Sequence, residues 1–101
     1  SFVAHLYRHD AHNFPATAAA KAGVEALLRA FAMEWAPHVT VNAVAPGYTQ
    51  KDPGAHAAFT EAQRQAVASR VPMGRLGTPA EMAAAIRFLC SEEAGYITGQ
   101  V

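Results

Sequence analysis

Apolar residues fall into separate blocks along the 101-residue chain, divided by polar stretches that contain proline and glycine. Residues 2–7 (FVAHLY) and 39–45 (VTVNAVA) are short runs of strand-forming residues. Residues 16–36 lie between them and are rich in good helix formers, with apolar side chains almost all round the helix. A strand, a helix and a strand in this order predict a right-handed βαβ unit with parallel strands. The pattern therefore predicts an α/β fold.

The second half of the chain predicts a loop followed by two helices. Residues 46–54 (PGYTQKDPG) follow the second strand as a loop, and residues 57–70 form a weaker helix. A stronger start signal comes at Thr78, which would cap a helix with Pro79 at its first position and Glu81 at its third. The apolar face of this helix is predicted to consist of Met82, Ile86, Leu89 and Cys90, with Cys90 buried.

Composition excludes several functional classes. Eight basic residues balance eight acidic ones, so neither a nucleic acid nor an anionic membrane surface is an expected partner. Cys90 is the single cysteine, which fits a reducing compartment, and no apolar run reaches the length of a membrane span. We therefore expect a cytoplasmic protein. Because the chain opens directly on an apolar run without a methionine and ends as a new extended segment begins, we expect it to be an excerpt of a longer α/β protein.

Lys21 is the lone cation in the largely apolar stretch 14–27 (FPATAAAKAGVEAL), at the start of the predicted helix. It can pair with Glu25 one turn later, or it can bind a ligand hydroxyl or phosphate. Pro46 and Gly47 support the second interpretation, because ligands of open α/β sheets bind beyond the carboxyl ends of strands. Proline fixes such a turn, and glycine lets the backbone approach a flat ring closely.

Two long stretches of the chain resemble a known family. These are AAAKAGVEALLRAFAMEWAPHVTVNAVAPGY and VPMGRLGTPAEMAAAIRFLCSEEAGYITGQ, which look like the carboxyl-terminal half of a short-chain dehydrogenase/reductase. The resemblance implies that residues 1–101 are that half of a single NAD(P)-binding domain with a Rossmann-type, doubly wound parallel sheet. It also implies hydride transfer between NAD or NADP and a small-molecule substrate, either a carbonyl or alcohol or an activated C=C bond. A homodimer or homotetramer, joined through the 16–36 helix, is implied as well.

The resemblance assigns roles to individual residues. Lys21 matches the lysine that holds the nicotinamide ribose and lowers the pKa of a neighbouring tyrosine. Pro46 and Gly47 match the turn beside the nicotinamide, and Tyr48 and Thr49 follow them, with the backbone at Thr49 meeting the carboxamide. A structural role is implied for Asn42.

The chain departs from the family pattern where the catalytic tyrosine should stand. That place, four residues before Lys21, holds Thr17, whose aliphatic hydroxyl is a poor proton donor near neutral pH. The family's strand-end serine is also missing from residues 4–7. One branch, the 2,4-dienoyl-CoA reductases, is similar in having Ser or Thr at the helical position, and some members take the tyrosine from the strand end. Tyr7 is the corresponding candidate acid, with a core or loop tyrosine as the alternative.

Other polar residues remain open between two interpretations. Lys51 stands where many members have a threonine at the pyrophosphate, and it either contacts phosphate or faces solvent. His5, His9 and His12 lack further ligands for a convincing metal site, so no metal is expected, although His5 or His9 can assist proton transfer near Tyr7. The alternative to an active enzyme is a catalytically impaired subunit with a role in assembly. Without a glycine-rich phosphate loop, residues 1–101 alone are expected to be inactive. The sequence leaves open the choice between NAD and NADP and the identity of the substrate.

Overall fold

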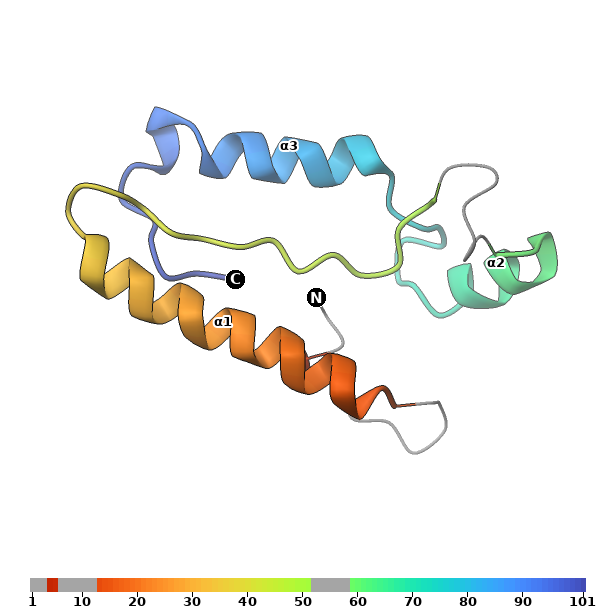
Figure 1. Ribbon diagram of the computed structural model, residues 1–101. Coiled ribbons are helices and arrows are strands. Elements are labelled where there is room, and N and C mark those ends of the chain that lie inside the picture. The colour runs from red at the N-terminus through yellow and green to blue at the C-terminus, as the bar shows by residue number, and fades with distance from the viewer. Residues whose placement is uncertain (1–3, 6–12, 52–58) are drawn as a thin grey trace.

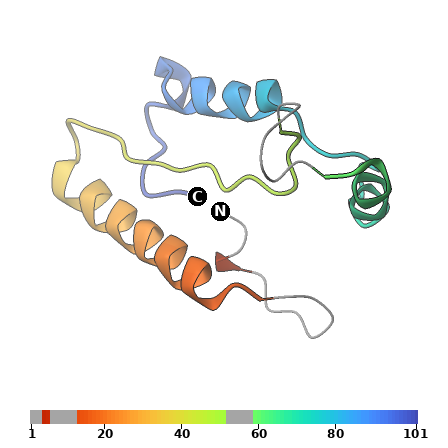
Figure 2. The same ribbon diagram turned by 45° about the vertical axis from the view of Figure 1, so that its right-hand side comes forward.

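The computed structural model describes residues 4–5, 13–51 and 59–101. Within these ranges the helical elements are α1 (Pro15–Trp35), α2 (Glu61–Ala68), α3 (Pro79–Leu89) and the 3-10 turn η2 (Glu92–Ala94). Figure 1 shows α1 and α3 on opposite sides of a middle layer, which consists of the long segment after α1 and the carboxyl-terminal segment. Figure 2 shows the same three layers from a second direction, with α2 beyond one end of the long helices.

The helix predicted over residues 16–36 is α1. Pro15 stands at its start, where a missing N–H leaves no hydrogen bond unmade, and the helix ends at Trp35, just before an extended Ala36 and Pro37. Its inner face is narrow and consists of Glu25, Leu28 and Ala32, the residues of α1 that are buried. This face packs toward the middle layer, where Gly99 lies close to Ala32.

A second apolar stripe on α1 is not covered by the residues that the structure describes. Val24, Leu27 and Phe31 lie one residue before each member of the buried face, so they are rotated about 100° around the helix from it. All of them are exposed. Phe31 stacks on Trp35 with ring centroids 4.5 Å apart and an angle of 10° between the ring planes. The sequence predicted apolar side chains almost all round this helix. The structure shows that the described residues cover only part of that apolar surface.

The middle layer contains paired segments rather than regular strands. Gly99 N–H donates to Val41 O at 2.8 Å and Ala43 N–H donates to Gln100 O at 3.0 Å, so the two segments run in the same direction. The side chain of Asn42 takes part in the pairing, donating to Ile97 O at 2.7 Å and accepting from Gln100 N–H at 3.1 Å. Because a side chain replaces a main-chain acceptor, the ladder is irregular. The expected structural role of Asn42 is confirmed.

The parallel sheet is therefore represented only in part. Among the described residues there is no regular strand, and the one isolated β-bridge joins Thr49 to Gly77 in parallel. Of the strand predicted at residues 2–7, Ala4 and His5 form a helical turn instead, and the other positions lie outside the described residues.

The capping box predicted for α3 is confirmed. Thr78 Oγ1 accepts from Glu81 N–H at 3.2 Å, and the Glu81 carboxylate accepts from Thr78 N–H at 2.8 Å. The predicted burial of Cys90 is wrong, since this residue caps the carboxyl end of α3 and is exposed. Ile86 is exposed as well, because this face borders a hollow of about 150 Å³ beside residues 40–44 that no side chain fills.

The predicted weaker helix at residues 57–70 corresponds to α2, which is shorter. Thr60 caps it, and together with Gln63 it forms a second capping box. No residue of α2 is buried, so its helical form rests on the cap and on local contacts such as the Glu61–Arg64 ion pair at 3.4 Å. None of the helices in the described part of the chain has the length and apolarity needed to cross a bilayer.

Candidate functional site

A hollow of about 520 Å³ brings together two regions of the chain that are distant in sequence. One side is the amino-terminal part of α1, and the other is the loop that leaves the middle layer. The residues lining the hollow are Lys21, Pro46, Gly47, Tyr48, Thr49, Gln50, Lys51 and Phe59. All the residues proposed from the sequence to bind a cofactor are in this set.

Lys21 reaches the hollow from an exposed position in the second turn of α1. Thr17 precedes it by one helical turn and therefore shares its face of the helix, but it is not among the residues that line the hollow. The alternative pairing of Lys21 with Glu25 does not occur among the described interactions. Glu25 instead accepts a hydrogen bond from His5 and lies 3.9 Å from Arg29. The ammonium group of Lys21 is therefore available to a ligand.

The loop wall of the hollow begins at Pro46 and Gly47. A Cβ added to Gly47 would meet no described atom within 4 Å, so this position leaves open space beside the backbone. Thr49 Oγ1 donates to Gly47 O at 3.3 Å and closes the turn on itself. Tyr48 and Thr49 are half-buried, whereas Lys21 opposite them is exposed. This arrangement suits a flat ring lying against backbone, with the Lys21 side chain lining the same hollow.

Main-chain hydrogen bonds hold the same loop from behind. Gly77 N–H donates to Tyr48 O at 2.9 Å, and Gln50 N–H donates to Gly77 O at 2.8 Å. A side chain at position 77 would be crowded, because a Cβ there would lie 3.3 Å from Met82 Cε. The loop is thus fixed against the segment that leads into α3. The sequence predicted the helix start at Thr78 but not this attachment, which joins residues far apart in the chain.

The electrostatic character of the hollow is positive. The described lining residues carry two ammonium groups, those of Lys21 and Lys51, and no carboxylate. Lys51 is both exposed and part of the lining, so both interpretations of this residue remain compatible with its position. Phe59 adds an aromatic surface that no sequence pattern indicated. A ligand with anionic or hydroxyl groups and a flat apolar part fits this chemistry.

Glu25 is the buried carboxylate of α1, and its closest partner is a histidine from the segment that precedes the helix. His5 Nε2 lies 3.0 Å from Glu25 Oε1 and fastens the amino-terminal segment to α1, one turn after Lys21. The sequence offered Glu25 only as a partner of Lys21. Tyr7, the candidate acid, lies outside the described residues, as do His9 and His12.

Glu81 is the most strongly perturbed acid in the described part of the chain. The Arg75 guanidinium, the Thr78 N–H and the Thr78 hydroxyl all donate to its carboxylate and lower the pKa of Glu81 to about 2. The reciprocal effect raises the pKa of Arg75 above its ordinary value. This group lies behind the Gly77 attachment rather than in the hollow, so it supports the loop and does not face a ligand.

Comparisons with known proteins give matches over most of the chain. All of residues 1–101 match a family model described as Enoyl-(Acyl carrier protein) reductase. The 3-oxoacyl-(acyl-carrier-protein) reductase FabG of Vibrio cholerae serotype O1 is 50% identical over 84 residues, which are 82% of this chain and 34% of the relative. A probable 2,4-dienoyl-CoA reductase of Bacillus subtilis is 46% identical over 86 residues, with the same coverage.

The fold has relatives among solved structures. A short chain dehydrogenase from Bacillus anthracis superimposes with a TM-score of 0.78 at 36% identity, covering 99% of this chain and 38% of that one. The chain spans about a third of the length of the curated relatives that it matches. The match over every residue, together with the shared fold, establishes that the chain belongs to the short-chain dehydrogenase/reductase family.

Proposed function

We propose that this chain is the carboxyl-terminal part of an NAD(P)-dependent oxidoreductase that acts on a carbonyl, an alcohol or an activated C=C bond. The observation that carries the proposal is the hollow, which places Lys21 opposite the backbone of Pro46–Thr49 although at least 25 positions separate them in the chain. A nicotinamide cofactor would supply the hydride when bound. The relatives' names support reductase chemistry on acyl thioesters in particular.

Each lining residue has a defined task in this proposal. The Lys21 ammonium donates hydrogen bonds to the ribose hydroxyls and keeps a positive charge beside the reacting region. Pro46 and Gly47 form a flat backbone surface for the ring, and Thr49 offers its main-chain groups to the carboxamide. Gly47 fits this role because no described side chain occupies the space beside it.

The proposed reaction also needs a proton donor. Thr17 can donate a hydrogen bond to a ribose or a substrate oxygen, but an aliphatic hydroxyl does not titrate near neutral pH and cannot act alone as the general acid. We propose Tyr7 for this role. The anchoring of His5 to Glu25 supports it, because His5 stands two residues before Tyr7 and is held one turn from Lys21.

We further propose that the protein is a homodimer or homotetramer that uses α1. Support comes from the exposed stripe of Val24, Leu27 and Phe31 on a helix whose adjacent inner face is already packed. Replacing Leu27 with Glu should lower the mass measured by analytical ultracentrifugation, whereas Ala30→Glu on the exposed surface of α1 serves as the control. An unchanged mass for Leu27→Glu would show that other parts of the protein cover this stripe.

A turnover assay of the complete protein tests the activity. NADH and NADPH should each be offered with a panel of carbonyl compounds and enoyl thioesters, and turnover is expected with at least one pair. Lys21→Met should lower kcat/KM by about 100-fold or more, as the loss of one charged site donor does, while Arg87→Gln on α3 should leave it unchanged. Cofactor binding without turnover on any substrate would instead support the impaired, assembly-type subunit.

Tyr7→Phe separates the candidate acid from the rest of the site. Loss of the general acid should cut kcat by about 10²–10⁴-fold while the dissociation constant of the cofactor stays nearly constant. Unchanged turnover would exclude Tyr7 as the acid and return the role to Thr17 or to a residue outside this chain.

A further inference from the structure

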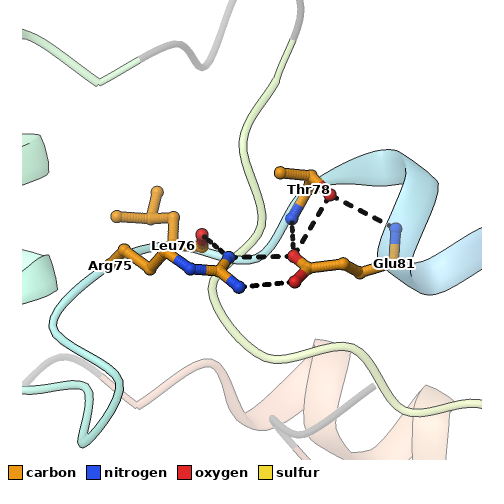
Figure 3. A network of polar contacts seen from close by, with 4 residues as sticks. All are labelled: Arg75, Leu76, Thr78 and Glu81. Carbon is orange, nitrogen blue, oxygen red and sulfur yellow. Dashed lines mark hydrogen bonds and ion pairs between the residues drawn. The ribbon is translucent and has the colours of Figure 1, made fainter.

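The exposed ion pair between Arg75 and Glu81 is held by two hydrogen bonds rather than by a single contact. Arg75 Nη1 donates to Glu81 Oε2 at 2.9 Å and Nη2 donates to Oε1, so two parallel hydrogen bonds join the planar groups (Figure 3). Such forked pairs fix orientation as well as distance, which single-point contacts do not. Both side chains are about half exposed, so the geometry does not arise from burial.

The same two side chains also hold the main chain on either side of Gly77. Arg75 Nη1 donates to Leu76 O at 3.1 Å, and Glu81 Oε2 accepts from Thr78 N–H at 2.8 Å and from Thr78 Oγ1 at 3.1 Å. Figure 3 shows the carboxylate placed between the guanidinium and the backbone of Thr78. Leu76 itself is buried, and this burial anchors the segment that contains Gly77. The backbone at Gly77 is thereby held from both neighbours.

Gly77 is in turn the residue that attaches the loop wall of the hollow. It donates to Tyr48 O, accepts from Gln50 N–H and forms the parallel bridge to Thr49. Those three residues line the hollow opposite Lys21. A continuous set of hydrogen bonds therefore leads from the Arg75–Glu81 pair through Gly77 to the wall that would face a cofactor.

We propose that Arg75 and Glu81 are positioning residues, which set the position of the Tyr48–Gln50 wall through Gly77 and so determine how tightly the hollow holds its ligand. The inference rests on the proposed function, because the ligand is the nicotinamide cofactor. Neither residue lines the hollow, so neither is a catalytic residue. Replacing either residue should therefore change the affinity for the cofactor more than the rate of the chemical step.

Conservative variants separate positioning from helix capping. Glu81→Gln keeps an acceptor for Thr78 and preserves the capping box, but it removes the charge that Arg75 binds. Arg75→Lys keeps the charge and loses the fork, whereas Arg75→Gln loses the charge as well. Arg64→Gln is the matched control, because it breaks the exposed Glu61–Arg64 pair on α2, which contacts neither Gly77 nor the hollow.

The first experiment measures steady-state kinetics of the complete protein. In Arg75→Gln and Glu81→Gln we expect KM for the cofactor to rise about tenfold, below the roughly hundredfold loss that a 1 Å displacement of a site group can cause. We expect kcat to change less, Arg75→Lys to restore part of the loss, and Arg64→Gln to match the wild type. A fall in kcat alone, or an equal rise in KM in the control, would overturn the proposal.

The second experiment needs no activity and therefore separates this proposal from the proposed function. Hydrogen exchange of the Gly77 and Gln50 amides reports their bonds to Tyr48 and Gly77 in the ligand-free protein. Both amides should exchange faster in Arg75→Gln and Glu81→Gln, while the interior amides of α3 keep their protection. If the two amides stay protected, or if α3 loses protection equally, the positioning role is excluded. A wild type that exchanges as expected but has no turnover would contradict only the proposed function.

Discussion

The carboxylates of Glu25 and Glu81 are held in contrasting environments. Glu25 is buried with its side chain 7% exposed, near His5 at 3.0 Å and Arg29 at 3.9 Å. Glu81 is exposed, yet it accepts hydrogen bonds from Arg75 and from the backbone and hydroxyl of Thr78. Burial makes a carboxylate costly unless it is paired, whereas the exposed one can be solvated without its partners. Removing a partner should therefore have different consequences at the two sites.

At Glu25 the expected consequence is a loss of stability. His5→Ala removes the nearest donor and leaves a buried carboxylate less well satisfied, which should cost about 1–3 kcal/mol in the free energy of unfolding. Denaturant unfolding of the complete protein measures this change. His5→Gln keeps a donor and should recover part of it. An unfolding free energy equal to that of the wild type in His5→Ala would show that Arg29 and solvent suffice.

At Glu81 the expected consequence depends on pH. The pKa of this carboxyl is lowered from its ordinary value of 4.5 to about 2 in the folded chain. A depressed folded-state pKa stabilises the protein above the ordinary value, and that contribution disappears as pH falls from about 4.5 toward 2. The difference in Tm between the wild type and Glu81→Gln should thus be largest near neutral pH and shrink over this range. A Tm difference that stays constant over this pH range would show that the charge of Glu81 does not contribute to stability.

At the scale of elements, α1 depends on close contact with the middle layer. Ala32 is 3% exposed, and its Cβ would lie 3.5 Å from a Cβ placed on Gly99, which has a φ of 72°. There is no space for a larger residue between the helix and this segment. Ala32→Leu should lower the free energy of unfolding by about 1–3 kcal/mol. Ala30→Leu, on the exposed surface, should change it little, and equal effects of the two would contradict the packing described here.

Elements defined by local chemistry were predictable from the sequence, and elements defined by distant pairing were not. The bounds of α1 follow from Pro15 and Pro37, and the start of α3 follows from Thr78 and Glu81, all within one turn of the feature they determine. The segment at residues 39–45 was predicted as a strand from its β-branched residues. Its pairing depends on Asn42 and Gln100, which lie 58 positions apart, and that irregular register has no local signal.

The candidate site shows the same division. The resemblance to a family identified Lys21 and Pro46–Thr49, and the structure places them around one hollow. The contribution of Phe59 and the support of the loop by Gly77 could not be read from the sequence, because both arise from tertiary contacts between distant segments. Cys90 was misassigned for a related reason, since helical periodicity indicates an apolar face but not whether something covers it.

At the scale of the whole molecule, the chain is more open than a domain of its size. The radius of gyration is 15.9 Å, compared with about 13 Å for a compact domain of 100 residues. The accessible surface is 7700 Å², against roughly 5,500 Å² for a folded monomer of this mass. Exposed large apolar residues occur on α1 and α3, including Leu27, Phe31 and Ile86. These faces are consistent with the proposal that further parts of the protein cover them.

This openness leads to a prediction about the isolated chain. Residues 1–101 contain one wall of the proposed cofactor site but no glycine-rich phosphate loop, so they should not bind NADH with micromolar affinity. Isothermal titration calorimetry, with NADH titrated into the isolated chain, measures this affinity directly. Micromolar binding would show that the hollow beside Lys21 suffices for recognition.

The stacked pair of Phe31 and Trp35 offers an optical test of the proposed assembly through α1. Trp35 is the single tryptophan of the 101 residues, and the residue is 43% exposed at the end of α1. Emission from an indole shifts to shorter wavelength when water is removed from around it. If the proposed assembly through α1 buries Trp35, its emission maximum should lie at a shorter wavelength in the assembly than in the separate chain, without any added label.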